Sequence, residues 1–297
     1  MKIVLTGSLG HINLPLTKQL VDKGHSVKVI THNAEHVKDI EKLGAIPVVG
    51  SISDENFLAA TFAGAEAVYL MVTLTNANPE DGIEKIAEKQ ANTYSDAVQR
   101  SNIKQVVNLS SVGANLGRES GALYLYHIIE KTLKKLDDVN ITFIRPTAMY
   151  YNLFCSLADI KQQRKIITNA DINQTQSWVA PEDIAPVVAK VLTSRQTGKN
   201  IQYVASDEVS YQEIAKIIGM KIGNPNLKSS QVSDDQMLKI LTNRGIPEKI
   251  ARELTKMTKC RRESDFYADY RAHQPKLGPT KMKDFARLFA QVYEKQN

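Results

Sequence analysis

The amino-acid sequence predicts an α/β fold: a doubly wound parallel sheet with helices on both faces, followed by a smaller, mainly helical region. Short apolar runs alternate with amphipathic segments through the first half of the 297 residues. The first apolar run leads directly into a turn that contains Gly7 and Gly10, and the alternation ends after Pro146. Alternating strands and helices are typical of a parallel sheet, and right-handed crossovers make the doubly wound topology the expected one.

The elements of the first half are expected in a regular order. A strand before Gly7 is followed by strands over residues 24–31, 46–49, 67–72, 105–110 and 141–145. The helices between them are expected over residues 14–23, 55–62, 79–101 and 124–136. The run 67–72 is apolar throughout and flanked by polar residues, which is typical of a parallel strand buried on both faces.

The second half is less regular. A helix is expected over residues 150–168, then a polar turn over 169–177. Pro181, with acidic residues directly after it, is typical of a helix start. One more strand is expected over residues 200–205. From Tyr211 onward the pattern is mainly helical.

Composition excludes several classes of protein. With 42% hydrophobic and 24% charged residues the chain resembles a soluble globular protein. No apolar run approaches the ~18 residues of a membrane span, and the N-terminus has no signal-peptide pattern. Cys155 and Cys260 fit no metal or redox spacing, so we expect no metal site and a cytoplasmic location. Much of the net charge of +6 lies in residues 249–262. Without a nucleic-acid motif, we expect a solvated helix face and no nucleic-acid partner.

The turn after the first strand has the features of a diphosphate-binding loop. A strand, a glycine turn and a helix N-terminus together present backbone N–H groups and the positive end of the helix dipole to an anion. Gly7 would allow the tight turn and Gly10 the approach of the diphosphate, whereas Asn13 departs from the usual third glycine or alanine. The second strand completes a βαβ unit of about 30 residues. The alternative is an ordinary turn without a ligand. The expected contacts are Gly7, Ser8, Leu9, Gly10, His11 and Ile12.

Six segments in a fixed order carry a resemblance to a known family: 5–12, 62–69, 106–113, 141–147, 178–185 and 211–215. On these segments the chain resembles the NmrA-like group of atypical short-chain dehydrogenases/reductases. The resemblance implies a Rossmann domain that binds NAD or NADP and a smaller domain that covers a substrate cleft. We expect residues 1–150 and 178–206 in the first, and 151–177 and 207–297 in the second. The family includes reductases of quinones, azo dyes or small carbonyl compounds, and members that bind a dinucleotide without catalysis.

The end of the second strand favours NADP over NAD. NAD-binding sites usually place an acid there, and this strand ends in Thr31, His32 and Asn33. These side chains can donate hydrogen bonds to a 2′-phosphate, and His32 can carry a charge. The arginine common in NADP-binding relatives is absent, so NAD remains possible. In the alternative interpretation His32 is a solvated turn residue.

Further cofactor contacts are expected where other strands end. Ser51 stands where relatives often have an aspartate near the adenine, and it can hydrogen-bond the adenine edge. Ligands of open α/β sheets lie at the carboxyl ends of the strands. By resemblance, four residues at such ends would line the ribose and nicotinamide: Met71, Val72, Thr73 and Ser110.

The catalytic residues are not evident from the sequence. Standard short-chain dehydrogenases use Tyr-x-x-x-Lys, which places both groups on one helix face. Here neither Tyr124 nor Tyr126 has a lysine four residues later, and the pair with that spacing is His127 and Lys131. Either His127 donates the proton, or ketone reduction is lost, or the substrate is a quinone or azo compound that solvent can protonate. Glu130 is expected to be a surface charge.

The aromatic segment 150–154 bears on the substrate. Its rings would suit a flat apolar compound beside the nicotinamide, or they would form core between domains. We expect an NADPH-dependent reductase of a small, flat, electron-poor substrate such as a quinone. The alternative is a non-catalytic NAD(P) redox sensor that acts on a regulatory protein partner. An epimerase-like enzyme is disfavoured because it usually needs the missing tyrosine.

Overall fold

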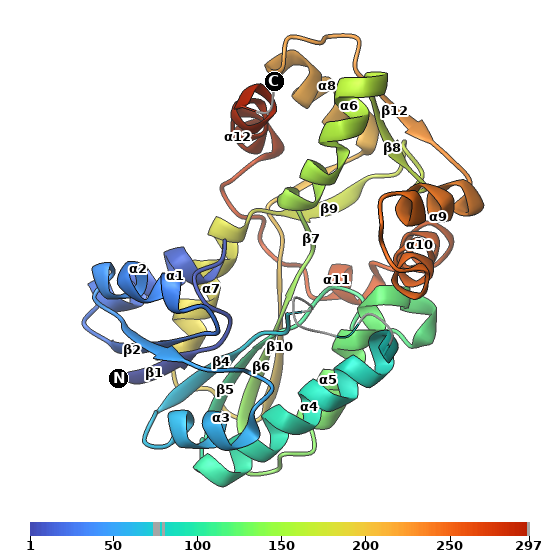
Figure 1. Ribbon diagram of the computed structural model, residues 1–297. Coiled ribbons are helices and arrows are strands. Elements are labelled where there is room, and N and C mark those ends of the chain that lie inside the picture. The colour runs from blue at the N-terminus through green and yellow to red at the C-terminus, as the bar shows by residue number, and fades with distance from the viewer. Residues whose placement is uncertain (74–77, 79–80, 296–297) are drawn as a thin grey trace.

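A seven-stranded parallel sheet forms the centre of the protein (Figure 1). The computed structural model describes residues 1–73, 78 and 81–295. The strand order is β10-β6-β5-β4-β1-β2-β3, so the order reverses between β1 and β4. This confirms the predicted doubly wound fold. The strands are β1 (Lys2–Leu5), β2 (Ser26–Thr31), β3 (Ile46–Val49), β4 (Ala67–Leu70), β5 (Gln105–Leu109), β6 (Asn140–Pro146) and β10 (Lys199–Val204).

Helices cover both faces of this sheet because its strands are apolar on both sides. On β1, Ile3 and Leu5 pack toward one layer of helices and Val4 toward the other. The first layer is α1 (Asn13–Asp22), α2 (Val37–Lys42) and α7 (Pro181–Thr193). The second layer is α3 (Glu55–Phe62), α4 (Gly82–Ser101) and α5 (Tyr124–Leu133). Short 3₁₀ helices precede α2 and α5: η1 (Ala34–His36) and η3 (Arg118–Leu123).

The second part of the chain contains two small sheets that the sequence did not predict. The predicted helix over 150–168 is confirmed in part, because residues 150–163 are helical, whereas its last residues form a strand that pairs with a later one. One sheet is β7 (Ala148–Met149), β9 (Gln176–Val179) and β11 (Asp207–Val209); the other is β8 (Lys165–Thr168) and β12 (Lys228–Gln231). The helices here are η4 (Tyr150–Ser156), α6 (Leu157–Gln163), α8 (Tyr211–Lys221), α9 (Asp234–Asn243), α10 (Glu248–Glu263), α11 (Ala268–Ala272) and α12 (Met282–Lys295).

The aromatic segment of η4 packs mainly against α12. Tyr150 is fully buried and stacks on Phe285 at 5.2 Å between ring centroids. Phe154 stacks on Phe289 at 5.4 Å. Tyr150 is therefore core within the smaller part of the chain, and Tyr151 and Phe154 are partly exposed.

The basic stretch of α10 is only partly a solvated face. Arg261 is 8% exposed, donates a hydrogen bond to the Gln176 side chain and lies over the ring of Phe266. Arg262 forms an ion pair with Asp234 at 3.0 Å. The expectation of a solvated face is wrong for these two arginines. Of the residues that the structure describes, no helix is long and apolar enough to cross a membrane.

The segment before α12 is fastened to the start of α7. The buried carboxylate of Asp183 accepts hydrogen bonds from Ser206 Oγ at 2.6 Å, Thr280 Oγ1 at 2.8 Å and Thr280 N at 3.1 Å. Gly278 lies against the same carboxylate, where a Cβ atom would stand 2.2 Å from Asp183 Oδ2. Because three hydrogen bonds fix that oxygen pair, a side chain at position 278 has no room.

We therefore expect Gly278→Ala to lower the free energy of unfolding by about 1–3 kcal/mol, the usual cost of overpacking. Urea unfolding measures the difference. Gly10→Ala is the matched control, because a Cβ there meets no atom within 4 Å. Its stability should stay within about 0.5 kcal/mol of the natural protein. Equal stability of the two variants would show that the Asp183 carboxylate moves freely.

Candidate functional site

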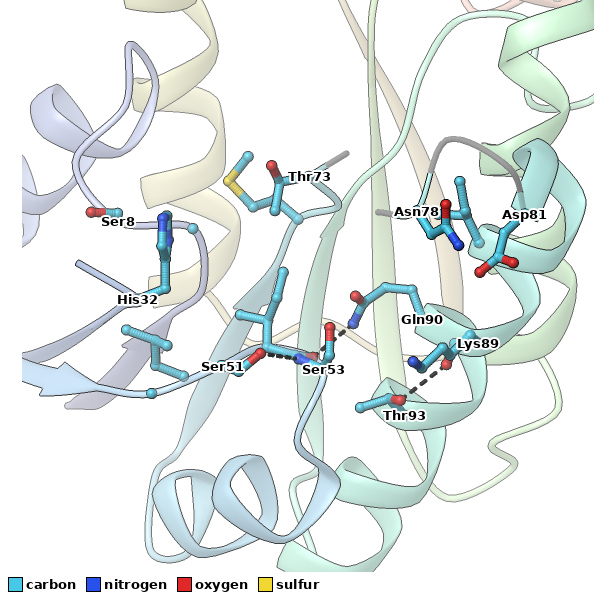
Figure 2. Close-up of a pocket in the computed structure, with 16 residues that line it drawn as sticks. Ser8, His32, Ser51, Ser53, Thr73, Asn78, Asp81, Lys89, Gln90 and Thr93 are labelled. Atoms are coloured by element: carbon cyan, nitrogen blue, oxygen red, sulfur yellow. Dashed lines mark hydrogen bonds between the residues drawn. The ribbon is translucent and has the colours of Figure 1, made fainter. Parts of the chain in front are cut away.

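A cavity of about 320 Å³ lies at the carboxyl edge of the sheet, where the strand order reverses. Figure 2 shows Ser8 and His32 on one side, Ser51 and Ser53 at the exit of β3, and side chains of α4 on the opposite side. Six of the predicted cofactor residues line this cavity: Gly7, Ser8, His32, Ser51, Met71 and Thr73.

Sequence reasoning missed the α4 wall of the cavity. Four residues of α4 line it: Ile86, Lys89, Gln90 and Thr93. Gln90 Nε2 donates to the carbonyl of Ile52 at 3.0 Å, which fixes the β3 exit against the helix. The four positions follow the spacing i, i+3, i+4, i+7 of one helix face, so the stripe on the helix after β4 is a signal that could have identified them.

The two glycines of the first turn have different surroundings. Gly7 has a φ of +94°, and a Cβ atom there would lie 2.1 Å from Met71 Sδ, so the fold itself requires glycine. At Gly10 a Cβ atom would meet no atom of the described residues within 4 Å, and the backbone is outside the left-handed region. The protein's own packing therefore does not explain Gly10, and the space beside it is open.

Asn13 explains how the turn tolerates a departure at its third position. Its amide is 1% exposed and donates to the carbonyls of Thr6 at 2.7 Å and Ser8 at 2.8 Å. These two hydrogen bonds hold the turn at the position where the usual diphosphate-binding loop has a closely packed glycine or alanine. The N-cap residue of α1, Ile12, provides no side-chain hydrogen bond. The helix therefore begins without a side-chain cap, although Leu14 N donates to the carbonyl of Gly10 at 2.9 Å and Leu16 N to the carbonyl of Ile12 at 3.1 Å.

At the end of β2 only one of the three predicted residues lines the cavity. Thr31 is buried, and its hydroxyl accepts from Ser8 Oγ at 3.0 Å and donates to the Asn33 carbonyl at 3.1 Å. Asn33 caps η1 by accepting from Glu35 N. His32 is exposed and lines the cavity. His36, which was not predicted, lies with Nδ1 2.7 Å from Ser8 Oγ.

The other predicted cofactor contacts lie outside this lining. Leu9 packs against the core beneath α1, and Ile12 is buried in it. His11 is exposed and its ring packs against that of Tyr151, tilted by 33° with 3.8 Å between the ring centroids, which joins the glycine turn to η4. Gly10 and Val72 are likewise not among the lining residues. Ser110 is 2% exposed, and its hydroxyl donates to Glu130 at 2.6 Å.

His127 and Lys131 lie at a second hollow of about 550 Å³, which shares none of its described lining residues with the first. His127 Nδ1 is 3.1 Å from the carbonyl of Ala114, and its ring stacks on Tyr124. The neighbouring Tyr126 does not replace the missing catalytic tyrosine as a proton donor, because burial raises the pKa of its phenol. The lining of this hollow comes from α5, β6, β10, α11 and the loop after β5: Ala114, Asn115, His127, Glu130, Lys131, Lys134, Arg145, Ile201 and Asp269.

Glu130 is not a surface charge, as the sequence suggested, but half of a buried ion pair. Glu130 is 1% and Arg145 is 2% exposed. Arg145 donates Nε to Oε1 at 2.8 Å and Nη2 to Oε2 at 2.7 Å. Burial by itself would raise the pKa of the Glu130 carboxyl, but the hydrogen bonds and charge of Arg145 hold that pKa below its usual range. Sequence reasoning missed the pair because its partners lie 15 positions apart on different elements.

The fold and the first cavity define a protein of the Rossmann type, with the architecture of NAD(P)-binding reductases. The chain belongs to the NmrA-like family, whose model matches residues 1–293. This confirms the resemblance. A curated relative, the 4-hydroxy-2-methyl-3-oxo-4-farnesyl-3,4-dihydroquinoline-1-oxide ketoreductase of Stigmatella aurantiaca, is 28% identical over 81 residues, which span 27% of this chain and only 24% of that enzyme.

Solved structures of similar fold cover nearly the whole chain. A triphenylmethane reductase from Citrobacter sp., complexed with NADP(H), has a TM-score of 0.77 at 18% identity and covers 97% of this chain and 99% of its own. An NADPH-dependent quinone oxidoreductase from Escherichia coli, complexed with NADPH, has a TM-score of 0.76 at 16% identity and covers 97% of this chain and 99% of its own. The negative transcriptional regulator Nmra has a TM-score of 0.73 at 15% identity and covers 100% of this chain and 97% of its own. At these identities the likeness concerns the fold alone.

We expect Glu130→Gln to destabilise the fold by about 3–5 kcal/mol, because it removes the buried counterion of Arg145 and leaves that arginine only the partly exposed Asp269. Glu84→Gln is the control, since its partner Arg118 and Glu84 itself are both well exposed. That change should cost at most about 1 kcal/mol. Urea unfolding of each variant measures both values. A loss at Glu130 no larger than at Glu84 would contradict a strong buried pair.

The same pair predicts a pH dependence. The folded-state pKa of Glu130 is lowered, so its contribution is fully present above the unfolded pKa of about 4.3. The contribution is lost as the pH falls through the folded value. Between neutral pH and that acidic range, the free energy of unfolding should therefore fall less in Glu130→Gln than in the natural protein. Parallel pH profiles would mean that Glu130 titrates alike in both states.

Proposed function

We propose that this protein binds NADPH in the cavity at the carboxyl edge of the sheet and reduces a small, flat, electron-poor substrate such as a quinone. The observation that carries the proposal is the open space at Gly10 beside the N-terminus of α1, which has no side-chain cap. Backbone N–H groups and the helix dipole favour an anion there, and a dinucleotide diphosphate is such a group. A glycine that packing does not require fits a backbone that a ligand approaches closely.

The surroundings of the cavity support NADPH over NADH. The exposed His32 can donate to a 2′-phosphate, and Lys89 adds a positive charge on the α4 side. The acid that lines the cavity, Asp81, is neutralised by Lys85 at 2.7 Å. No acid stands at positions 31–33 to bind both ribose hydroxyls. The triphenylmethane reductase and the quinone oxidoreductase of similar fold are both described with NADP(H) or NADPH.

We assign the parts of the cofactor to this chain's residues as follows. The turn from Gly7 to Ile12 would hold the diphosphate through its backbone. Ser51 would face the adenine edge, with the β3 exit fixed by Gln90. Met71 and Thr73 would lie along the ribose that leads to the nicotinamide. When bound, the reduced nicotinamide would supply a hydride.

The position of His127 favours a quinone over a ketone. A ketone needs a nearby group to protonate the developing alkoxide, whereas a reduced quinone can take protons from solvent. His127 and Lys131 line the second hollow and do not line the cofactor cavity. We therefore propose solvent as the proton source, and keep the His127–Lys131 pair as the alternative for a carbonyl substrate.

A dinucleotide-binding regulator is the second candidate function. The missing Tyr-x-x-x-Lys favours it, and the similar fold of the regulator Nmra is compatible with it. In that case NADPH would bind but would not be oxidised, and the partner would be another protein. Following the NADPH absorbance after addition of quinones separates the two candidates, because only the reductase consumes the cofactor.

Gly10→Val should abolish NADPH binding, because a branched side chain would occupy the space beside the helix N-terminus. Calorimetric titration measures the affinity. Urea unfolding should show little change, since the fold leaves this space open. Gly10→Ala should weaken binding less than Gly10→Val. An unchanged NADPH affinity in Gly10→Val would remove this turn from the site.

His32→Asp should weaken NADPH at least about tenfold more than NADH, because the new carboxylate repels a 2′-phosphate. His32→Asn is the control, since it removes the imidazole without adding a charge, and its effect should be smaller. Parallel calorimetric titrations with both cofactors give the ratio. If NADH and NADPH lose affinity equally in His32→Asp, the 2′-phosphate lies elsewhere.

His127→Ala should leave the rate of quinone reduction within about twofold if solvent supplies the protons. Steady-state rates with one quinone and with one small ketone test this. A loss of about a hundredfold or more with the quinone would identify His127 as the proton donor and overturn the assignment to solvent.

A further inference from the structure

The second hollow has features of a binding site that the proposed reductase function does not use. It lies beside β10 at the edge of the sheet, and no residue of the cofactor cavity lines it. We propose that it binds a small organic molecule through a carboxylate group. A volume of about 550 Å³ is within the usual range for small-molecule sites.

The charge of the lining favours a single negative charge in the ligand. Three cations, Lys131, Lys134 and Arg145, face two carboxylates, Glu130 and Asp269. Among the lining residues that the structure describes, one positive charge therefore has no counterpart. A carboxylate would balance it, whereas a phosphate dianion would leave an excess of negative charge.

The uncompensated charge is that of Lys131. Its side chain is exposed, and within the part of the chain that the structure describes it has no hydrogen-bond or ion-pair partner. By contrast, Lys134 Nζ lies 2.9 Å from Glu130 Oε2. Arg145 is paired with Glu130 at 2.7 Å and with Asp269 at 2.9 Å. Lys134 and Arg145 are thus paired with the two carboxylates of the lining, Glu130 and Asp269. The charge of Lys131 is left to bind a ligand.

Further donors of the lining are fixed in place before a ligand arrives. Arg145 Nη2 makes a single hydrogen bond, to Glu130 Oε2, so one of its two N–H groups has no partner among the described residues. Its guanidinium is held by Tyr203 and Asp269 as well as Glu130. A rigid donor set reduces the entropy lost on binding. Ala114 and Ile201 add apolar surface, so the carboxylate should belong to a molecule with an apolar body.

Benzoate is the probe that matches this description, and benzamide is its neutral counterpart. At low ionic strength, titration of the full chain with benzoate should shift the imidazole proton resonance of His127 in a saturable way. Lys131→Gln should weaken benzoate at least about tenfold, as expected for the loss of a charge-assisted contact. Lys135→Gln is the matched control. It removes a charge that is also exposed but lies outside the described lining, and affinity should stay within about twofold.

Four outcomes would overturn the proposal. They are the absence of saturable benzoate binding, equal weakening by the two lysine variants, equal affinity for benzamide, and tighter binding of inorganic phosphate than of benzoate. The titration is repeated in the presence of NADPH. Unchanged benzoate affinity supports a separate site, whereas displacement of benzoate by NADPH would place the probe in the cofactor cavity.

Discussion

The buried ion pair between Glu130 and Arg145 ties together the elements at one end of the main sheet. Arg145 belongs to β6 and Glu130 to α5, and Ser110 at the end of β5 donates to the same carboxylate. The arginine also reaches Tyr203 on β10 and Asp269 on α11. Two buried charges avoid a large free-energy cost only while they remain paired with each other. The positions of five elements around the second hollow are therefore mutually dependent, although they come from residues 110 to 269 of the chain.

The glycine turn depends on a different set of short-range bonds. Asn13 holds the carbonyls of Thr6 and Ser8, and Ser8 adopts a φ of 52°, which is rare for a residue with a side chain. The hydroxyl of Ser8 is in turn held by Thr31 and His36. The turn is thus fixed by side-chain hydrogen bonds instead of a third close-packed glycine. Backbone groups of the turn are therefore available on the side that faces the cavity, as a diphosphate site requires.

Local patterns predicted the main sheet well, because strand periodicity and turn residues act over a few positions. They also predicted six of the residues that line the first cavity, since these lie at strand ends. Partners distant in sequence could not be predicted in this way. The strand β8 depends on pairing with β12, some 60 residues later, and Glu130 is buried only because Arg145 reaches it. The α4 wall has a local signal, a stripe at helical spacing, but its residues do not lie at strand ends.

The position of β10 has a consequence for how the protein is made on the ribosome. This strand forms an edge of the main sheet next to β6, yet it is translated after β7, β8 and β9 of the smaller sheets. While the nascent chain ends before Val204, β6 is itself an edge with unpaired backbone groups, and Arg145 lacks Tyr203. The first 150 residues therefore cannot mature as a finished unit during synthesis. Co-translational folding must keep this edge from pairing with other chains until residues 199–204 have been made.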